Sequence, residues 1–217
     1  MTKGIVLLSG GLDSLVSLGL GIKEYNVSLA LTFDYGQKSV DYEIRASKDI
    51  CDYYGIRHEI IKLDWLKNIT HTSLVSDKKV PEKIDENSAK NVWVPNRNGL
   101  FLNIAGSFAD GENYDYILIG ANKEEAQTFP DNTQEFIDRV NSEFEFSTQK
   151  HPKVVAPLIN YDKNGIVELA LKNDIPLKFV KSCYVGGMKH CGKCESCIRL
   201  KNALINNNAV KYIEELF

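Results

Sequence analysis

The sequence contains no apolar run of the roughly 20 residues that a membrane-spanning helix requires. Its first residues, Met1 to Gly4, also lack the charged segment and small-residue cleavage site of a secretory signal peptide. Cysteine is absent from most of the chain: it occurs five times, and four of these positions lie between residues 183 and 197. We therefore expect a cytoplasmic protein with no membrane partner. We also expect the four clustered cysteines to act together at one site.

An excess of basic side chains is missing as well. The 26 lysines and arginines are outnumbered by 29 aspartates and glutamates, which gives a formal net charge of −3. Affinity for a nucleic-acid backbone depends mainly on basic side chains, so this balance argues against a stable nucleic-acid partner. One basic stretch, from Lys178 to Lys201, is open to two interpretations: a solvated surface or a region that attracts anions.

Apolar runs of strand length alternate with segments of helical spacing along the chain. This alternation predicts an α/β fold, a Rossmann-like parallel sheet with helices on both faces. We expect one α/β domain over residues 1–180 and a small cysteine-containing element over residues 181–217. The predicted strands are 4–8, 27–33, 58–63 and 116–120, and the predicted helices are 13–23, 40–54, 98–109, 134–145 and 164–172.

One long segment, residues 67–91, is polar and aperiodic. A loop of this length in a compact domain is usually functional or mobile. Two interpretations stay open, a lid over a substrate and plain disorder. Lysine and glutamate side chains of this segment are candidates for a general base.

The first predicted strand runs into a turn with two adjacent glycines, Ser9-Gly10-Gly11-Leu12-Asp13-Ser14, and a helix follows. Such a turn places backbone N–H groups beside the positive end of a helix dipole, where phosphate binds. It fits neither GxxxxGK[ST] nor GxGxxG. The candidate nucleotide-binding residues are those from Leu8 to Ser14. Asp13 has two interpretations, a metal ligand or a cap of the helix.

The four clustered cysteines are Cys183, Cys191, Cys194 and Cys197, in the pattern C-x7-C-x2-C-x2-C. In a reducing compartment this spacing indicates a metal site rather than disulfides. Four thiolates fill the tetrahedral shell of a structural zinc ion. An iron–sulfur cluster is the competing interpretation, but the further C-x3-C-P of ferredoxin-like sequences is absent. We interpret Cys51 as a buried small residue and His190 as a surface residue.

The SGGLDS turn directly after the first strand resembles the pyrophosphate-binding loop of the N-type ATP pyrophosphatases. Together with three further stretches, it makes essentially the whole chain resemble the 7-cyano-7-deazaguanine synthase family. Those stretches are "FDYGQK" at 33–38, "WVPNRN" at 93–98 and the four-cysteine pattern with Arg199 just beyond it.

The resemblance implies an ATP-dependent ligase that forms carbon–nitrogen bonds. Its reaction converts 7-carboxy-7-deazaguanine and ammonia to the nitrile through an adenylated acid and an adenylated amide. It releases AMP (or ADP-level products) and pyrophosphate, and the product feeds the tRNA bases queuosine or archaeosine. The implied cofactors are ATP, Mg²⁺ with the ATP, and one structural Zn²⁺ per chain on the four cysteines; the implied assembly is a homodimer.

Candidate site residues follow from placing these motifs on this chain. The catalytic candidates are Asp13, Ser14 and Arg97, where Arg97 is either an anion-binding residue or a helix-start residue paired with an acid. The substrate-binding candidates are Tyr35, Gln37 and Asp131.

Three stretches depart from the family pattern. Asn96 replaces a glycine of "VPGRN", but asparagine tolerates a positive φ, so we expect the turn to be kept. The "DFSGYPDC" region reads "EEAQTFPDN" here, and "YGQRH" reads "YGQKS". The second departure puts the purine-like substrate in question more than the ATP chemistry. The alternatives are therefore another PP-loop adenylating enzyme acting on a different acceptor, and a zinc-ribbon binding module without catalysis.

Overall fold

The computed structural model describes residues 2–82 and 91–217. In this part of the chain, five parallel strands form one sheet in the order β3-β2-β1-β4-β5. The strands are β1 (Gly4–Leu7), β2 (Val27–Asp34), β3 (Arg57–Lys62), β4 (Tyr116–Leu118) and β5 (Lys153–Val155). The predicted parallel α/β sheet is confirmed.

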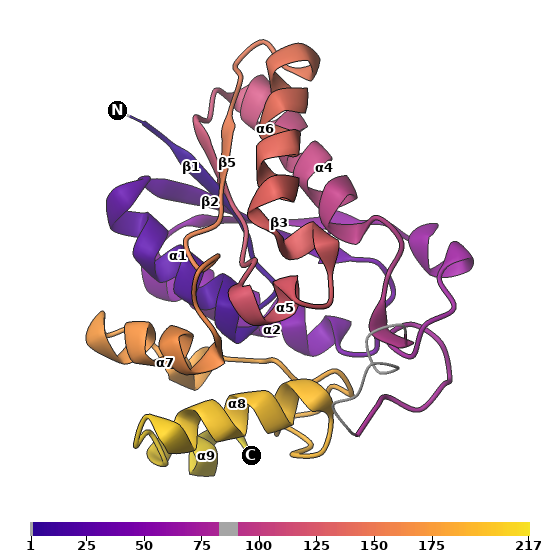
Figure 1. Cartoon of the computed structure of the whole chain (residues 1–217), viewed down its shortest axis with the longest axis vertical. Coiled ribbons are helices and arrows are strands. Elements are labelled where there is room, and N and C mark those ends of the chain that lie inside the picture. The colour runs from indigo at the N-terminus through magenta and orange to yellow at the C-terminus, as the bar shows by residue number, and fades with distance from the viewer. Residues whose placement is uncertain (1, 83–90) are drawn as a thin grey trace.

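Helices cover both faces of the sheet (Figure 1). The α-helices are α1 (Leu12–Glu24), α2 (Val40–Tyr54), α4 (Arg97–Glu112), α5 (Lys123–Ala126), α6 (Gln134–Ser147), α7 (Lys163–Lys172), α8 (Glu195–Asn206) and α9 (Lys211–Leu216). Short 3₁₀ helices occupy Leu66–Ile69, Pro130–Asn132 and Leu177–Phe179. The segment 67–91, which the sequence analysis left open as a lid or as disorder, is described only in part. Residues 83–90 of it lie outside the described residues.

The core has two main layers because side chains of a strand alternate between the faces of the sheet. Val6 and Leu8 point to the layer that α1, α2, α7, α8 and α9 cover. Ile5 and Leu7 point to the layer beneath α4 and α6. Figure 1 shows α4 and α6 side by side, α7 next to α1, and α8 and α9 beyond α7.

Two glycines shape the carboxyl ends of the central strands. Gly10 has φ +73°, and a Cβ there would lie 2.8 Å from the Cβ of Ala46 in α2. At Gly120, after β4, an added Cβ would approach the backbone of Asp13 to 3.1 Å. The turn after β1 therefore packs closely against both neighbouring segments.

Every strand and helix expected from the sequence is present; helix α2 has the predicted bounds, and no end of the others differs by more than three residues. Helix α2 ends at Tyr54, and Gly55 follows in the left-handed conformation with φ +67°. The strand β5 and the helices α5, α8 and α9 were not predicted. Among residues 2–82 and 91–217, no helix combines the length and apolar character needed to cross a membrane.

Candidate active site and metal centre

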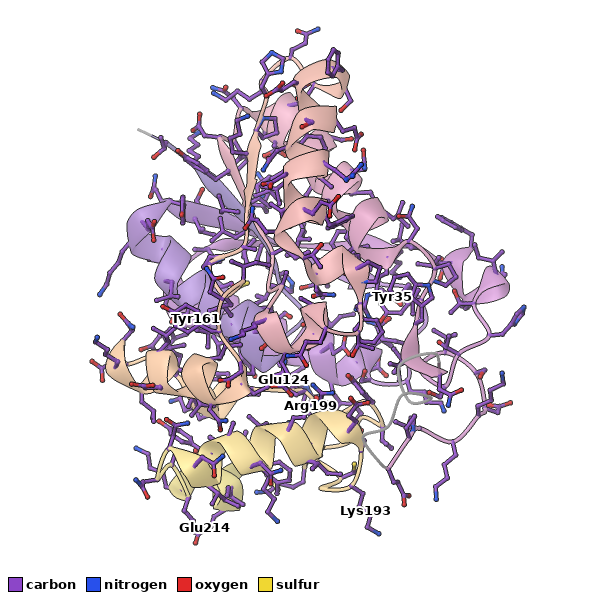
Figure 2. The ribbon with its side chains drawn as sticks, viewed as in Figure 1. Tyr35, Glu124, Tyr161, Lys193, Arg199 and Glu214 are labelled. Carbon is purple, nitrogen blue, oxygen red and sulfur yellow. The ribbon has the colours of Figure 1, made fainter. Side chains whose placement is uncertain are left out.

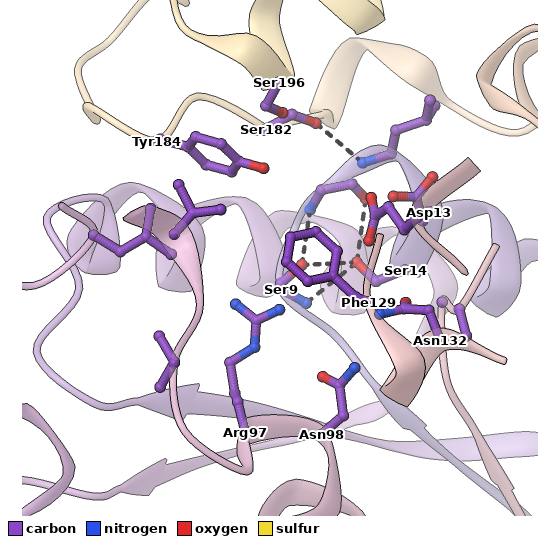
Figure 3. A pocket seen from close by; sticks show the side chains of 18 of the residues that line it. Ser9, Asp13, Ser14, Arg97, Asn98, Phe129, Asn132, Ser182, Tyr184 and Ser196 are labelled. Atoms are coloured by element: carbon purple, nitrogen blue, oxygen red, sulfur yellow. Dashed lines mark hydrogen bonds between the residues drawn. The ribbon is translucent and has the colours of Figure 1, made fainter. Parts of the chain in front are cut away.

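A pocket of about 920 Å³ opens at the carboxyl ends of β1, β2 and β4. The strand order reverses between β1 and β4, which is where open parallel sheets bind ligands. Figure 3 shows side chains from the turn after β1, from α4 and from the cysteine-containing segment around one space. The sequence-predicted residues on its lining are Leu8, Ser9, Gly11, Leu12, Asp13, Ser14, Tyr35, Gln37, Arg97 and Asp131.

The turn from Ser9 to Ser14 forms a compact loop with its polar groups facing the pocket (Figure 3). The backbone N–H of Ser9 donates to the Ser14 hydroxyl at 3.2 Å, and that of Gly11 donates to the Ser9 hydroxyl at 3.3 Å. The two hydroxyl oxygens are 3.2 Å apart. We call residues 9–14 the phosphate loop, because these donors lie at the start of α1, where the helix dipole favours an anion.

The alternative interpretation of Asp13, a helix cap, is wrong. The residue before α1 is Gly11, with extended backbone, and Asp13 lies inside the helix at its second position. The Asp13 carboxylate instead accepts from Lys163 Nζ at 2.6 Å. Its other oxygen, Oδ1, is buried and has no hydrogen-bond partner among the described residues.

Lys163 lies at the start of α7 and joins two carboxylates. Its Nζ is 2.6 Å from Asp13 Oδ2 and 2.8 Å from Glu125 Oε1. Burial acts to lower the pKa of Lys163, but the two carboxylates outweigh it and raise that pKa. Burial raises the pKa of Asp13 against the opposing charge of Lys163, whereas Lys163 lowers the pKa of Glu125 despite burial. With both carboxylates ionised, this triad carries one excess negative charge, which favours an additional cation.

A second ion-pair group joins α5 to α8. Arg199 lies 2.5 Å from both Glu124 Oε1 and Glu195 Oε1. Figure 2 shows Glu124 and Arg199 facing each other between the sheet and the C-terminal helices. All three residues line the pocket, so the C-terminal segment forms part of its wall.

Arg97 is the first residue of α4, and its side chain lies across the pocket from Ser9 (Figure 3). Asn96 before it has φ +49°, which confirms that asparagine supports the turn expected there. Burial acts to lower the pKa of Arg97, but Tyr35, Asp131 and Glu125 raise it, so the guanidinium stays charged. Burial also raises the pKa of Asp131, against the nearby charge of Arg97. Arg97 thus offers a positive charge inside the pocket and faces the phosphate loop.

Gln37 is held by its neighbours. Its side-chain oxygen accepts from the Tyr35 backbone N–H at 3.0 Å, and its Nε2 donates to Glu43 Oε2 at 2.8 Å. Glu43 also accepts from Ser39 Oγ at 2.5 Å, and burial raises its pKa. Gln37 and Tyr35 reach the pocket with fixed side chains, and Glu43 is a lining carboxylate that the sequence did not single out.

Two aromatic side chains on the lining, Trp93 and Phe129, provide a flat surface. Their ring planes differ by 15° and their centroids are 5.8 Å apart. Phe129 belongs to the divergent segment "EEAQTFPDN". A planar heterocycle stacks favourably on such rings.

The four clustered cysteines form one group. Their sulfurs all lie within 4.8 Å of one another, and none is in a disulfide. The Cys191 and Cys197 sulfurs are 3.8 Å apart. Thiolates at about 2.3 Å from a tetrahedral zinc ion lie about 3.8 Å from one another, so the group fits a single ion.

Backbone N–H groups point at these sulfurs. The N–H of Cys194 donates to the Cys191 sulfur at 3.3 Å, and the N–H of Cys191 donates to the Cys183 sulfur at 3.4 Å. Such donors stabilise thiolates, which are the form that binds metal.

The prediction of a surface His190 is wrong. Its side chain is buried, with a relative exposure of 5%. The ring Nδ1 lies 3.0 Å from the Leu216 carbonyl, and the ring packs against Phe217 at 4.9 Å between centroids. The C-terminal helix covers this histidine, a contact that sequence spacing does not reveal. Cys51 is buried, as expected.

The pocket lining also contains four charged residues that the sequence did not single out: Lys163, Glu124, Glu125 and Glu195. The two glutamates of α5 follow β4, the strand next to β1, and the carboxyl ends of neighbouring parallel strands meet at one edge. That topology was the available signal. Lys163 offered no comparable signal, because its position depends on how α7 packs against α1.

Comparison with protein families gives one match over most of the chain. A family model described as "Queuosine biosynthesis protein QueC" matches residues 3–208. A curated protein named 7-cyano-7-deazaguanine synthase from Methanosarcina mazei is 50% identical over 217 residues, which cover 94% of each chain. A protein of the same name from Carboxydothermus hydrogenoformans is 51% identical over 211 residues, covering 94% of this chain and 98% of its own.

Solved structures share the fold at low identity. The U34-tRNA thiolase NcsA from Methanococcus maripaludis, solved with its 4Fe-4S cluster, is 17% identical with a TM-score of 0.51, covering 99% of this chain and 69% of its own. A 4-thiouridine synthetase in complex with RNA and bound ATP is 21% identical with a TM-score of 0.53, covering 99% and 53%. These likenesses concern the fold alone.

Proposed function

The chain belongs to the family of the queuosine biosynthesis protein QueC, and from this premise we propose that it acts as a 7-cyano-7-deazaguanine synthase. In this reaction ATP and ammonia convert 7-carboxy-7-deazaguanine to the nitrile. One observation carries the proposal for this chain: the phosphate loop, the Lys163 triad and Arg97 face the same pocket. That arrangement provides a place for a triphosphate beside a place for an acceptor carboxylate.

The chemistry needs an activated leaving group, because a carboxylate would otherwise have to expel oxide. A carboxylate oxygen of the substrate attacks the α-phosphorus of ATP, and the bond to the bridging oxygen of the β-phosphate breaks. Ammonia then attacks the carboxyl carbon, and AMP leaves with one carboxyl oxygen to give the amide. The amide oxygen attacks a second ATP; loss of AMP and the two N–H protons gives the nitrile. Each turnover consumes two ATP.

We assign the leaving pyrophosphate to the phosphate loop, at the positive end of α1. The N–H groups at the start of α1 suit its charge. The Ser9 and Ser14 hydroxyls would exchange their hydrogen bonds within the loop for bonds to it. Lys163 supports this role as a buried cation beside the loop. Across the pocket, Arg97 suits the α-phosphate or the substrate carboxylate, because guanidinium groups bind such anions in a bidentate manner.

We propose that Trp93 and Phe129 stack the deazaguanine ring and that Tyr35, Gln37 and Asp131 contact it. The parallel aromatic pair on the pocket lining supports the first assignment. The positions of these residues on the pocket lining and the half-buried carboxyl of Asp131 support the second. The substituted "EEAQTFPDN" segment still supplies an aromatic ring and a carboxylate to the pocket.

We further propose that Mg²⁺ binds with ATP at Asp13 and Glu125. The fit is supported by the unpartnered buried Oδ1 of Asp13 and by the presence of two carboxylates around one lysine. Carboxylate oxygens together with phosphate oxygens are the usual ligands of Mg²⁺. The ion would neutralise charge on the leaving pyrophosphate.

For the cysteine group we propose one structural zinc ion. The short sulfur separations support a single ion over an iron–sulfur cluster, whose several iron and sulfide atoms would hold the four cysteines further apart. Four thiolates leave no open coordination position, so the ion would stabilise the segment without taking part in the reaction.

Four further assignments rest on the family resemblance and the composition. They are free ammonia as the nitrogen donor, a homodimer, a cytoplasmic location and a product for queuosine or archaeosine. The five free cysteines support a reducing compartment.

We also propose residues 1–180 and 181–217 as the two structural units. Light scattering after gel filtration tests the dimer, which has twice the chain mass of 24.4 kDa.

The proposed function is tested by incubating the purified protein with ATP, Mg²⁺, ammonium and 7-carboxy-7-deazaguanine, followed by mass spectrometry. The expected result is the nitrile, with AMP and pyrophosphate formed only when the acid is present. AMP formation only with some other acceptor would favour a different adenylating enzyme. No AMP under any condition would favour a binding module without catalysis.

A further inference from the structure

The cysteine-containing segment reaches the phosphate loop through Ser182. We propose that the Ser182 hydroxyl is a phosphate-binding donor of the ATP site and that His190 positions it. The cysteine cluster then organises part of the ATP site in addition to stabilising the fold. This inference rests on the proposed use of ATP, and its test below separates the two.

Two hydrogen bonds attach the segment to the loop, and a third distance shows how closely they approach. The Lys181 backbone N–H donates to the Gly10 carbonyl at 2.7 Å. The Leu12 backbone N–H donates to Ser182 Oγ at 3.2 Å, across 170 positions of sequence. A Cβ placed on Gly11 would lie 3.8 Å from the same oxygen. Figure 3 shows Ser182 beside the loop, joined to it by this hydrogen bond.

The orientation of the Ser182 hydroxyl follows from the Leu12 contact. Its oxygen accepts a hydrogen bond there, so its own hydrogen must point elsewhere. In the part of the chain that the structure describes, that hydrogen has no acceptor. Ser9 and Ser14 differ, since their hydroxyls are hydrogen-bonded within the loop. Ser182 lines the pocket and therefore offers a free donor beside the place assigned to the phosphates.

His190 holds the backbone of Ser182. Its ring Nε2 accepts from the Ser182 N–H at 3.1 Å, which requires the proton on Nδ1. Nδ1–H then donates to the Leu216 carbonyl at 3.0 Å. Because the ring is buried under Phe217 and bonded at both nitrogens, it has one orientation available.

Both residues of this contact are tied to the cysteine cluster by sequence. Ser182 precedes Cys183, and His190 precedes Cys191. The residues that follow them, Cys183 and Cys191, are also hydrogen-bonded to each other: the Cys191 N–H donates to the Cys183 sulfur at 3.4 Å. An ion held by both sulfurs would fix the two chain segments that form the Ser182–His190 contact. Loss of the ion should therefore loosen the phosphate loop.

The first test measures binding of α,β-methylene ATP, which cannot be cleaved between its α and β phosphates, by calorimetry. We expect Ser182→Ala to weaken binding about tenfold, the effect of one hydrogen bond to a charged group. Ser182→Thr restores the hydroxyl and should restore affinity. Ser142→Ala, an exposed serine of α6, is the matched control. Metal content and thermal stability should stay at wild-type values in all three proteins.

The outcomes separate the inference from the proposed function. A wild-type protein that does not bind the analogue contradicts the use of ATP itself. A wild-type protein that binds, with Ser182→Ala binding within twofold of it, contradicts the role of Ser182.

The second test addresses His190 as a positioning residue. We expect His190→Ala to weaken analogue binding as Ser182→Ala does, and to add less than about twofold in the double variant, because the two act through one contact. Lys189→Ala is the control, since Lys189 also binds the C-terminal segment, through the Glu214 and Glu215 carbonyls. Equal weakening by Lys189→Ala, or additive effects in the double variant, would overturn the positioning role.

Discussion

At the scale of single residues, the most informative arrangement is one lysine shared by two buried carboxylates. Lys163 cannot neutralise both Asp13 and Glu125, and Asp13 keeps one oxygen without a partner in the described residues. Such a group gains little as a structural ion pair, because burial opposes the charges. We infer that this group binds a further cation together with an anionic ligand.

The first prediction concerns Asp13→Asn, which keeps the shape of the side chain and removes its charge. We expect release of AMP and pyrophosphate to fall by about 10²-fold or more, as for loss of a preorganised electrostatic group. Lys163 keeps Glu125 as its partner, so the protein should stay folded. Pyrophosphate release and urea unfolding measure the two effects.

The control for this variant is Asp138→Asn on the exposed side of α6, where the carboxylate accepts from Gln134. It should retain wild-type activity. An Asp13→Asn protein that is fully active, or one that cannot fold, would show that the carboxylate is not required for the reaction or is chiefly structural.

The sequence identified the residues of the phosphate loop because they are contiguous and follow a strand. It could not identify Lys163 or Ser182, since each reaches the loop only through long-range packing. His190 was assigned to the surface for the same reason: the segment that covers it lies 26 positions further along the chain. The contiguous phosphate loop could therefore be predicted from the sequence. The residues that reach it from distant parts of the chain could not.

At the scale of elements, the turn into α4 determines where Arg97 points. Asn96 takes the left-handed conformation with φ +49°, and the helix starts at the next residue. The sequence predicted this turn from the tolerance of asparagine. The other ends of predicted elements shifted slightly, because a strand end depends on its neighbours in the sheet. Strand β5 was missed because its apolar run is cut short by a proline two residues after it, whereas β4 lies in the longer apolar run YILIG.

The second prediction is that Asn96→Ala lowers the free energy of unfolding by about 1 kcal/mol, because the polar side chain of asparagine offsets the cost of the left-handed conformation and the alanine methyl does not. Asn96→Gly, which matches the family pattern, should retain or slightly improve stability. Chemical denaturation of the three proteins checks this order. An alanine variant as stable as the glycine variant would mean that the turn relaxes to another conformation.

The third prediction concerns the contact between β2 and β3. His58 Nε2 lies 2.8 Å from Thr32 Oγ1, which donates to the Leu8 carbonyl just before the phosphate loop. Burial lowers the pKa of His58 below its ordinary value of 6.5. As the pH falls below 6.5, His58 becomes protonated in the unfolded chain before it does so in the native state. Its contribution to the free energy of unfolding therefore decreases as the pH decreases.

Unfolding by urea at a series of pH values from 8 to 5 measures this effect. His58→Gln keeps a donor toward Thr32 but does not titrate. The free energy of unfolding of the wild type, relative to this variant, should decrease as the pH falls through 6.5. A difference that stays constant with pH would contradict the assignment.

At the scale of the whole molecule, the two ends of the chain meet at one site. The phosphate loop begins at residue 9, and the lining of the same pocket includes Ser182, Glu195 and Arg199. The sequence predicted both motifs and treated them as separate units. Because Lys181 and Ser182 bind the loop directly, the cysteine-containing segment and the sheet form one functional assembly.

The fourth prediction is that Cys194→Ser lowers the zinc content well below one ion per chain and reduces thermal stability, since binding of structural zinc contributes strongly to folding. Cys51→Ala is the control: this cysteine is buried in the sheet layer, and burial raises its pKa to about 12, so it should not bind metal. Metal analysis and thermal unfolding give the readouts. Full metal content in Cys194→Ser would contradict the four-cysteine site.

The central claim is that the pocket activates a carboxylate, and then its amide, by transfer of AMP. It is tested most directly with 7-carboxy-7-deazaguanine carrying ¹⁸O at both carboxylate oxygens, in the presence of ATP and ammonia. The account predicts two AMP per nitrile, each with one ¹⁸O on its phosphate, and unlabelled pyrophosphate. Label found in inorganic phosphate or water, or AMP formed without ¹⁸O, would contradict it.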